Sequence, residues 1–190
     1  MASKKETKCI VCGTMIKYKT KKPEKCAKCK SNANKIRKPR GMSQSSKTKW
    51  KNESEMYKVL SSLLPRTQYC TGGYYSWLPS PKNQPMQLDW YSYELGLAFE
   101  YNGIQHYSYT KYFHKTKQEF LYLLECDKLK KELCAEEGVR LISIKYDTDL
   151  TVRNIAYEIK KQNKKLYAEL LKENQLNLTS EDIKAINNIK

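Results

Sequence analysis

A short turn between two apolar runs marks the centre of this chain as a β-hairpin. Residues 87–93 and 97–101 are rich in aromatic and aliphatic side chains, and residues 94–96 between them end in a glycine. If the two strands pair, Asp89 and Glu100 come close together. Two such carboxylates repel each other unless a cation lies between them, and Mg²⁺ is held by one or two carboxylates, waters and a substrate phosphate. The hairpin therefore indicates a metal site, although ordinary surface acids would show the same spacing.

Helices and one further strand are expected around this hairpin. Asn52 is a good N-cap, which predicts a helix from there to Pro65. Thr179 and Asp182 have the spacing of a capping box, which predicts a short last helix from about Ser180. The other expected elements are a strand over 66–78, a loop over 107–116, a helix over 117–137, a strand over 139–144 and a long basic helix over 151–174. This pattern predicts an α/β protein with a mixed sheet.

Four of the seven cysteines form two C-x-x-C pairs near the start of the chain. Two such pairs supply the tetrahedral sulfur ligands of structural Zn²⁺, and we expect residues 1–31 to form a small zinc ribbon that folds on binding the metal. An iron–sulfur cluster or cysteines without a shared role are the alternatives. The zinc ligands would be Cys9, Cys12, Cys26 and Cys29, and the cysteines expected to be small core residues are Cys70, Cys126 and Cys134.

Positive charge is concentrated in the first quarter of the chain. The net charge is +16, and residues 1–50 contain 16 Lys and Arg against two acids, a net of +14. This segment, which includes a basic linker over 32–51, predicts a nucleic-acid partner, with a solubilising tail as the alternative. The residues expected to contact nucleic acid are Lys17, Lys19, Lys21, Lys22, Lys25, Lys28, Arg37, Lys38 and Arg40.

The hairpin sequence resembles a known nuclease motif. Leu88-Asp89-Trp90 and the run from Ala98 to Tyr107, AFEYNGIQHY, are similar to the core of PD-(D/E)XK nucleases, in the phage and viral branch akin to very-short-patch-repair and homing endonucleases. The similarity covers about residues 52–147. It implies a restriction-endonuclease-like core over 52–150, a mixed sheet flanked by helices, followed by a helical extension over 151–190.

The resemblance also implies roles for individual residues. Asp89 matches the metal-ligating aspartate, and Glu100 matches the second acid of the motif. Gln105 matches a glutamine that replaces lysine in this branch, and His106 follows it as a general base, a phosphate contact or a residue packed on its neighbour. Glu53 aligns best with a glutamate on the first helix, with Glu55 as the alternative, and this acid would orient water or complete the metal shell.

Two positions depart from the motif. Asn102 stands where aspartate is common, and Cys126 stands where arginine is common. Asp127 and Lys130 lie one turn apart on the predicted helix, where we expect them to form an ion pair. His114 is expected to be exposed or to contact phosphate. Tyrosines that flank the site can stack on exposed bases or serve ordinary packing, and these are Tyr74, Tyr75, Tyr107, Tyr109 and Tyr112.

These features predict an endonuclease that depends on Mg²⁺ or Mn²⁺ and hydrolyses DNA, either by nicking or in a structure-specific way. Its substrate would be duplex, nicked or branched DNA. The alternative is a non-catalytic transcription or replication factor that reuses the same fold. We expect a phage or viral protein that acts as a homodimer or within a larger viral complex. No apolar run of membrane-spanning length and no signal peptide is present, so we expect it to be intracellular, in the cytoplasm or nucleus, and not secreted.

Overall fold

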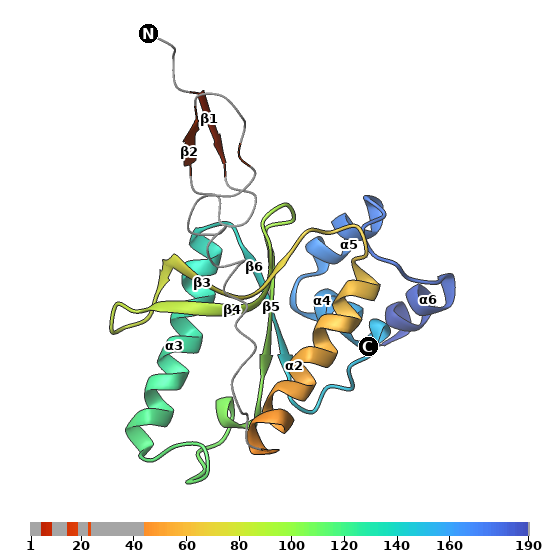
Figure 1. Ribbon diagram of the computed structural model, residues 1–190. Coiled ribbons are helices and arrows are strands. Elements are labelled where there is room, and N and C mark those ends of the chain that lie inside the picture. Colours follow the sequence, from red (N-terminus) through yellow and green to blue (C-terminus); the bar gives the residue numbers. More distant parts are fainter. Residues whose placement is uncertain (1–4, 9–14, 19–22, 24–43, 190) are drawn as a thin grey trace.

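The computed structural model describes residues 5–8, 15–18, 23 and 44–189 (Figure 1). Two short antiparallel strands, β1 (Lys5–Lys8) and β2 (Met15–Tyr18), lie near the start of the chain. In β2, Lys17 forms an ion pair with Glu6, with 3.3 Å between Nζ and Oε1. The predicted residues outside the described part are Cys9, Cys12, Cys26, Cys29, Lys19, Lys21, Lys22, Lys25, Lys28, Arg37, Lys38 and Arg40.

The centre of the protein is a mixed sheet of four strands in the order β3-β4-β5-β6. The strands are β3 (Cys70–Pro79), β4 (Pro85–Ser92), β5 (Leu97–Asn102) and β6 (Arg140–Lys145). β3, β4 and β5 pair in antiparallel fashion, whereas β5 and β6 are parallel. The predicted hairpin is therefore confirmed as β4 and β5, joined by a turn at Gly96, which has a positive φ of 52°.

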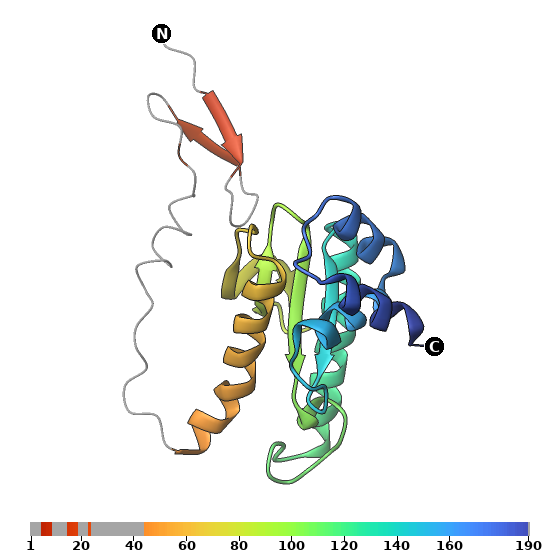
Figure 2. The same cartoon turned by 90° about the vertical axis from the view of Figure 1, so that its right-hand side faces the viewer.

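Helices cover both faces of this sheet (Figures 1 and 2). They are α2 (Gln44–Leu63), α3 (Lys117–Glu136), α4 (Val152–Gln162), α5 (Lys164–Lys172) and α6 (Ser180–Asn188), with a 3₁₀ turn η1 (Ile104–His106) after β5. The predicted mixed α/β class with flanking helices is thus confirmed. Within the described residues, no helix combines the length and the apolar composition needed to span a membrane.

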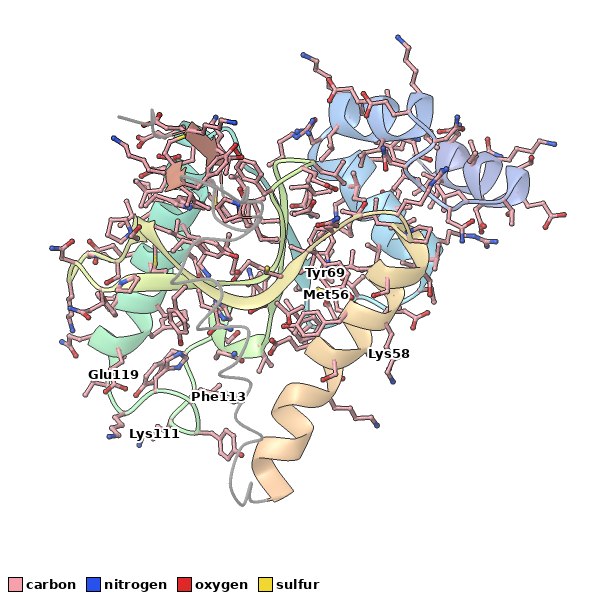
Figure 3. The ribbon with its side chains drawn as sticks, turned by 45° about the horizontal axis from the view of Figure 1, so that its top comes forward. Met56, Lys58, Tyr69, Lys111, Phe113 and Glu119 are labelled. Atoms are coloured by element: carbon pink, nitrogen blue, oxygen red, sulfur yellow. The ribbon has the colours of Figure 1, made fainter. Side chains whose placement is uncertain are left out.

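Two apolar cores lie on opposite faces of the sheet. The larger core joins α2 and α4–α6 to the sheet, and Trp90, Phe99 and Ile155 are fully buried in it. Figure 3 shows Met56 and Tyr69 between α2 and the sheet, while Lys58 points outward from the same helix; Tyr69 stacks on Trp90 at 5.2 Å between ring centroids. The smaller core packs α3 against the other face. The sheet is therefore fixed from both sides.

The structure corrects two predicted helix boundaries. The first long helix begins at Gln44, eight residues before the predicted N-cap at Asn52. The predicted helix over 151–174 is two helices, because Asn163 leaves the helical conformation at φ −151° and ψ 88°. Its side chain accepts a hydrogen bond from the N–H of Leu166 and caps α5. The predicted capping box of Thr179 and Asp182 is present in α6.

Candidate active site

The two central carboxylates lie where β4 and β5 stop pairing. The register of the two strands ends at Trp90 and Phe99. Immediately beyond, the N–H of Tyr101 donates to Asp89 Oδ2 at 2.9 Å, and the N–H of Asp89 donates to Glu100 Oε1 at 3.1 Å. Each carboxylate is thus oriented by a backbone donor from the other's strand. The expectation that Asp89 and Glu100 lie close together is confirmed.

Burial makes this carboxylate pair costly to ionise. Glu100 is only 8% exposed, and desolvation raises its pKa to about 7, with the charge of Asp89 as the next cause. Desolvation likewise raises the pKa of Asp89. The Lys130 ammonium, 2.6 Å from Glu100 Oε2, acts in the opposite direction on both groups. When both acids are ionised, their two negative charges exceed the single positive charge of this lysine.

α3 supplies two side chains to the site, but their partners differ from the prediction. Asp127 and Lys130 do not pair with each other. Instead, Asp127 Oδ2 lies 2.6 Å from His106 Nδ1, while Lys130 binds Glu100. The reason is the packing of α3 on η1 and β5, which brings a different partner to each of the two side chains. Charge on the His106 imidazole is among the smaller causes that lower the pKa of Asp89, against the desolvation that raises it.

α2 contributes Glu53 and a tyrosine that sequence reasoning missed. The hydroxyl of Tyr57 donates to Glu53 Oε1 one helical turn earlier. The pKa of Tyr57 is raised far above its ordinary value, first by burial and then by the negative charges of Glu53, Asp89 and Glu100. Tyr57 therefore lies on the face of α2 that turns toward the carboxylates. The four-residue spacing places Glu53 and Tyr57 on the same face of a helix, and this was the sequence pattern that could have predicted their contact.

The remaining candidates have different surroundings. Gln105 folds its amide over Gly103, so that a Cβ on Gly103 would clash with Gln105 Oε1. Asn102 forms a side-chain hydrogen bond with Tyr107. The prediction that His114 is exposed is wrong: its side chain is buried, and its ring stacks on that of Tyr109 at 5.9 Å. Of the cysteines expected in the core, Cys134 is fully buried, whereas Cys70 and Cys126 are partly exposed.

The donor chemistry at the strand ends fits a hard divalent cation. Within the described residues, no three His, Cys, Asp or Glu side chains gather closely enough to hold a metal ion. Mg²⁺ needs fewer protein ligands, because it binds one or two carboxylates and keeps waters and substrate oxygens in its other positions. Asp89 and Glu100 can provide the two carboxylates. A divalent cation there would offset the desolvation that raises both pKa values.

Comparisons with known proteins point to viruses. The chain is 33% identical over 85 residues to uncharacterized protein 033L of Invertebrate iridescent virus 3, covering 39% of this chain and 44% of that protein. It is 40% identical over 73 residues to uncharacterized protein 307L of Invertebrate iridescent virus 6, covering 38% and 35% of the two chains. It is also 38% identical over 77 residues to uncharacterized protein 094L of Frog virus 3, covering 40% and 47%.

These relatives support the predicted viral origin. The matched segments span less than half the length of each relative. No known family of proteins matches the chain, and no solved structure is significantly similar to it.

Proposed function

We propose that this protein is a metal-dependent DNA endonuclease that hydrolyses phosphodiester bonds at Asp89 and Glu100, within a restriction-endonuclease-like domain. The observation that carries the proposal is the carboxylate pair itself. A buried acid, Glu100, and a partly buried one, Asp89, meet where two strands separate, and Lys130 from α3 lies 2.6 Å from Glu100. A protein that only binds DNA gains nothing from such acids, because they repel phosphate and are costly to bury.

Asp89 and Glu100 would hold Mg²⁺ or Mn²⁺. When bound, such an ion supplies Lewis-acid chemistry: it polarises a phosphoryl oxygen and lowers the pKa of a bound water. Desolvation raises the pKa values of both acids, and a bound divalent cation would stabilise their ionised forms, which favours this assignment. Glu53 and Tyr57, which bond to each other on α2, would orient water at the site.

His106 is the proposed proton carrier of the site. Asp127 bonds to its Nδ1 at 2.6 Å and thereby presents Nε2 as the free end of the ring. In hydrolysis, an attacking water forms the new P–O bond, the P–O bond to the leaving oxygen breaks, and one proton moves from the water toward that oxygen. Nε2 can accept the proton from the water, while the Lys130 ammonium balances negative charge as it grows on the phosphate.

The first part of the chain would bring the substrate to this site. We propose a structural Zn²⁺ on Cys9, Cys12, Cys26 and Cys29, because two C-x-x-C pairs can supply the four thiolate ligands of such a site. The net charge of +14 in residues 1–50 supports binding to duplex, nicked or branched DNA.

Cleavage assays test this function. Full-length protein is incubated with labelled duplex, nicked, branched and single-stranded DNA, with Mg²⁺ or Mn²⁺ and with EDTA. We expect metal-dependent cleavage that Asp89→Ala and Glu100→Ala reduce at least about 10³-fold while DNA affinity stays within about twofold. Glu55→Ala is the matched control, because Glu55 is an exposed acid on α2 paired with Lys58. Full cleavage by either site variant would refute the assignment.

One observation favours a second function, a non-catalytic nucleic-acid-binding factor. Lys130 already places a cation on Glu100, which reduces the need for a metal. That function predicts tight DNA binding, no cleavage of any of the four substrates, and the same affinity in Asp89→Ala as in the unaltered protein. The same assays separate the two functions.

A further inference from the structure

Two exposed tyrosines and a lysine form a surface beside the carboxylate pair, and we name Tyr107, Lys145 and Tyr146 the stacking surface. The ring centroids of Tyr107 and Tyr146 are 5.9 Å apart, with an angle of 54° between the ring planes. Lys145 Nζ lies 5.5 Å from the centroid of Tyr107 and 5.2 Å from that of Tyr146. Tyr107 is 45% exposed and Tyr146 is 37% exposed. Both rings therefore keep open area for another molecule.

The fold places this surface next to the proposed site. β5 and β6 run parallel, and the last residue of β5, Asn102, pairs with Lys145 at the end of β6. Asn102 also bonds to Tyr107, and it lies two residues after Glu100 on the same strand. A nucleotide on the stacking surface would therefore lie close to a phosphate at the carboxylates.

Hydrogen bonds hold the surface in place without covering it. The hydroxyl of Tyr101 donates to the backbone carbonyl of Tyr146 at 3.1 Å. Asn52 Nδ2 on α2 donates to the same hydroxyl at 2.8 Å. This chain of contacts connects α2, β5 and the end of β6, so the position of Tyr146 is set by the core elements of the site. Preorganised rings lose little freedom when a base stacks on them.

A second pair of exposed rings lies on the loop that follows η1. Tyr112 and Phe113 meet edge to face at 4.8 Å, and both are exposed. Figure 3 shows Phe113 and Lys111 on this loop, at the end of the molecule where α2 begins. Figures 1 and 2 agree that the loop and the start of α2 share this end. This loop therefore also exposes aromatic and basic side chains.

We infer that the stacking surface binds unpaired bases of a DNA strand, so that the preferred substrate carries unpaired nucleotides next to the cleaved phosphate. This inference rests on the proposed nuclease function and narrows its substrate. Aromatic rings stack on every base, whereas paired bases inside a duplex offer no open face. Lys145 adds positive charge for the neighbouring phosphates, although it also pairs with Asp147 at 2.6 Å. Each of the two exposed rings can stack on an unpaired base.

The inference is tested by binding in EDTA, where cleavage plays no part. Fluorescence anisotropy measures the affinity of full-length protein for a duplex, a duplex with a single-stranded branch, and a single strand of equal length. We expect Tyr107→Ala with Tyr146→Ala to weaken binding to branched and single-stranded DNA about tenfold or more, with duplex binding within about twofold. Phenylalanine at both positions keeps the rings and should restore affinity.

Tyr122→Ala is the matched control, because Tyr122 on α3 also lies under a lysine, with Lys82 Nζ 4.3 Å from its ring. It should bind all three DNAs like the unaltered protein. Equal losses on paired and unpaired DNA, or no loss, would overturn the inference. A second measurement needs no variant: unpaired 2-aminopurine in the branch should lose fluorescence on binding as it stacks, and unchanged fluorescence would contradict stacking. A result against stacking leaves the cleavage assay untouched, so the two proposals fail separately.

Discussion

The pH dependence of stability should reveal the burial of Glu100. The folded protein holds a proton on this residue up to a pKa of about 7, whereas the ordinary value is 4.5. A group whose pKa is raised by folding stabilises the folded protein at pH values below its pKa in the unfolded chain. This contribution is lost as the pH rises through its pKa in the folded protein. The folded and unfolded pKa values differ by about 2.5, and a change of one in pKa corresponds to about 1.36 kcal/mol. The free energy of unfolding should therefore fall by about 3 kcal/mol, most of it between about pH 5 and about pH 8.

The perturbation is Glu100→Gln, which keeps the shape of the side chain and removes its titration. Urea unfolding without divalent ions gives the free energy of unfolding of both proteins across this pH range. Relative to the variant, the unaltered protein should lose about 3 kcal/mol as pH rises. The difference between the free energies of unfolding of the two proteins reports on both carboxylates, because the charge of Asp89 contributes to the raised pKa of Glu100. Glu55→Gln, at an exposed glutamate on α2, should instead run parallel to the unaltered protein.

Adding Mg²⁺ completes the experiment. If the carboxylates bind the ion, the unaltered protein should regain about 1 kcal/mol or more at about pH 8 when the ion is at roughly ten times its dissociation constant. Glu100→Gln should regain much less. Parallel pH profiles for the unaltered protein and Glu100→Gln would refute the reasoning, since they would mean that Glu100 is hydrated and ionised throughout.

Two further predictions concern positioning and stability. Asp127→Asn should lower DNA cleavage about 10²-fold, because His106 loses the carboxylate at 2.6 Å that orients its ring. The double variant of Asp127→Asn and His106→Ala should cleave DNA no more slowly than His106→Ala alone. Unchanged cleavage by His106→Ala would remove His106 from catalysis. Asn163→Ala should lower the free energy of unfolding by about 1 kcal/mol in urea, because the N–H of Leu166 loses its cap; a change near zero would mean that water replaces the cap without cost.

The hairpin was predictable from the sequence because its evidence is local. Apolar runs and a glycine turn define β4 and β5, and strand pairing then brings Asp89 and Glu100 together. The break at Asn163 was harder to predict, because the apolar stripe continues from α4 into α5 and the break depends on one side chain that caps a backbone N–H. The early start of α2 likewise lacks an apolar signal, since residues 44–52 are almost entirely polar.

Long-range partners were the least predictable part of the site. Asp127 and Lys130 have the spacing of an ion pair within one helix, and only the packing of α3 on η1 and β5 gives each a different partner. Tyr146 follows β6 and has no sequence neighbour in the hairpin; the parallel pairing of β5 and β6 brings it to Tyr107. The four cysteines of the predicted zinc ribbon and most of the predicted DNA contacts lie outside the described residues and stay predictions.

The most direct measurement is anomalous X-ray scattering from crystals soaked in Mn²⁺. The proposed site predicts one anomalous peak within coordination distance of both the Asp89 and Glu100 carboxylates, and its loss in Asp89→Ala crystals. A peak elsewhere, or none at a manganese concentration that supports DNA cleavage in solution, would contradict the metal assignment on which the proposed hydrolysis depends.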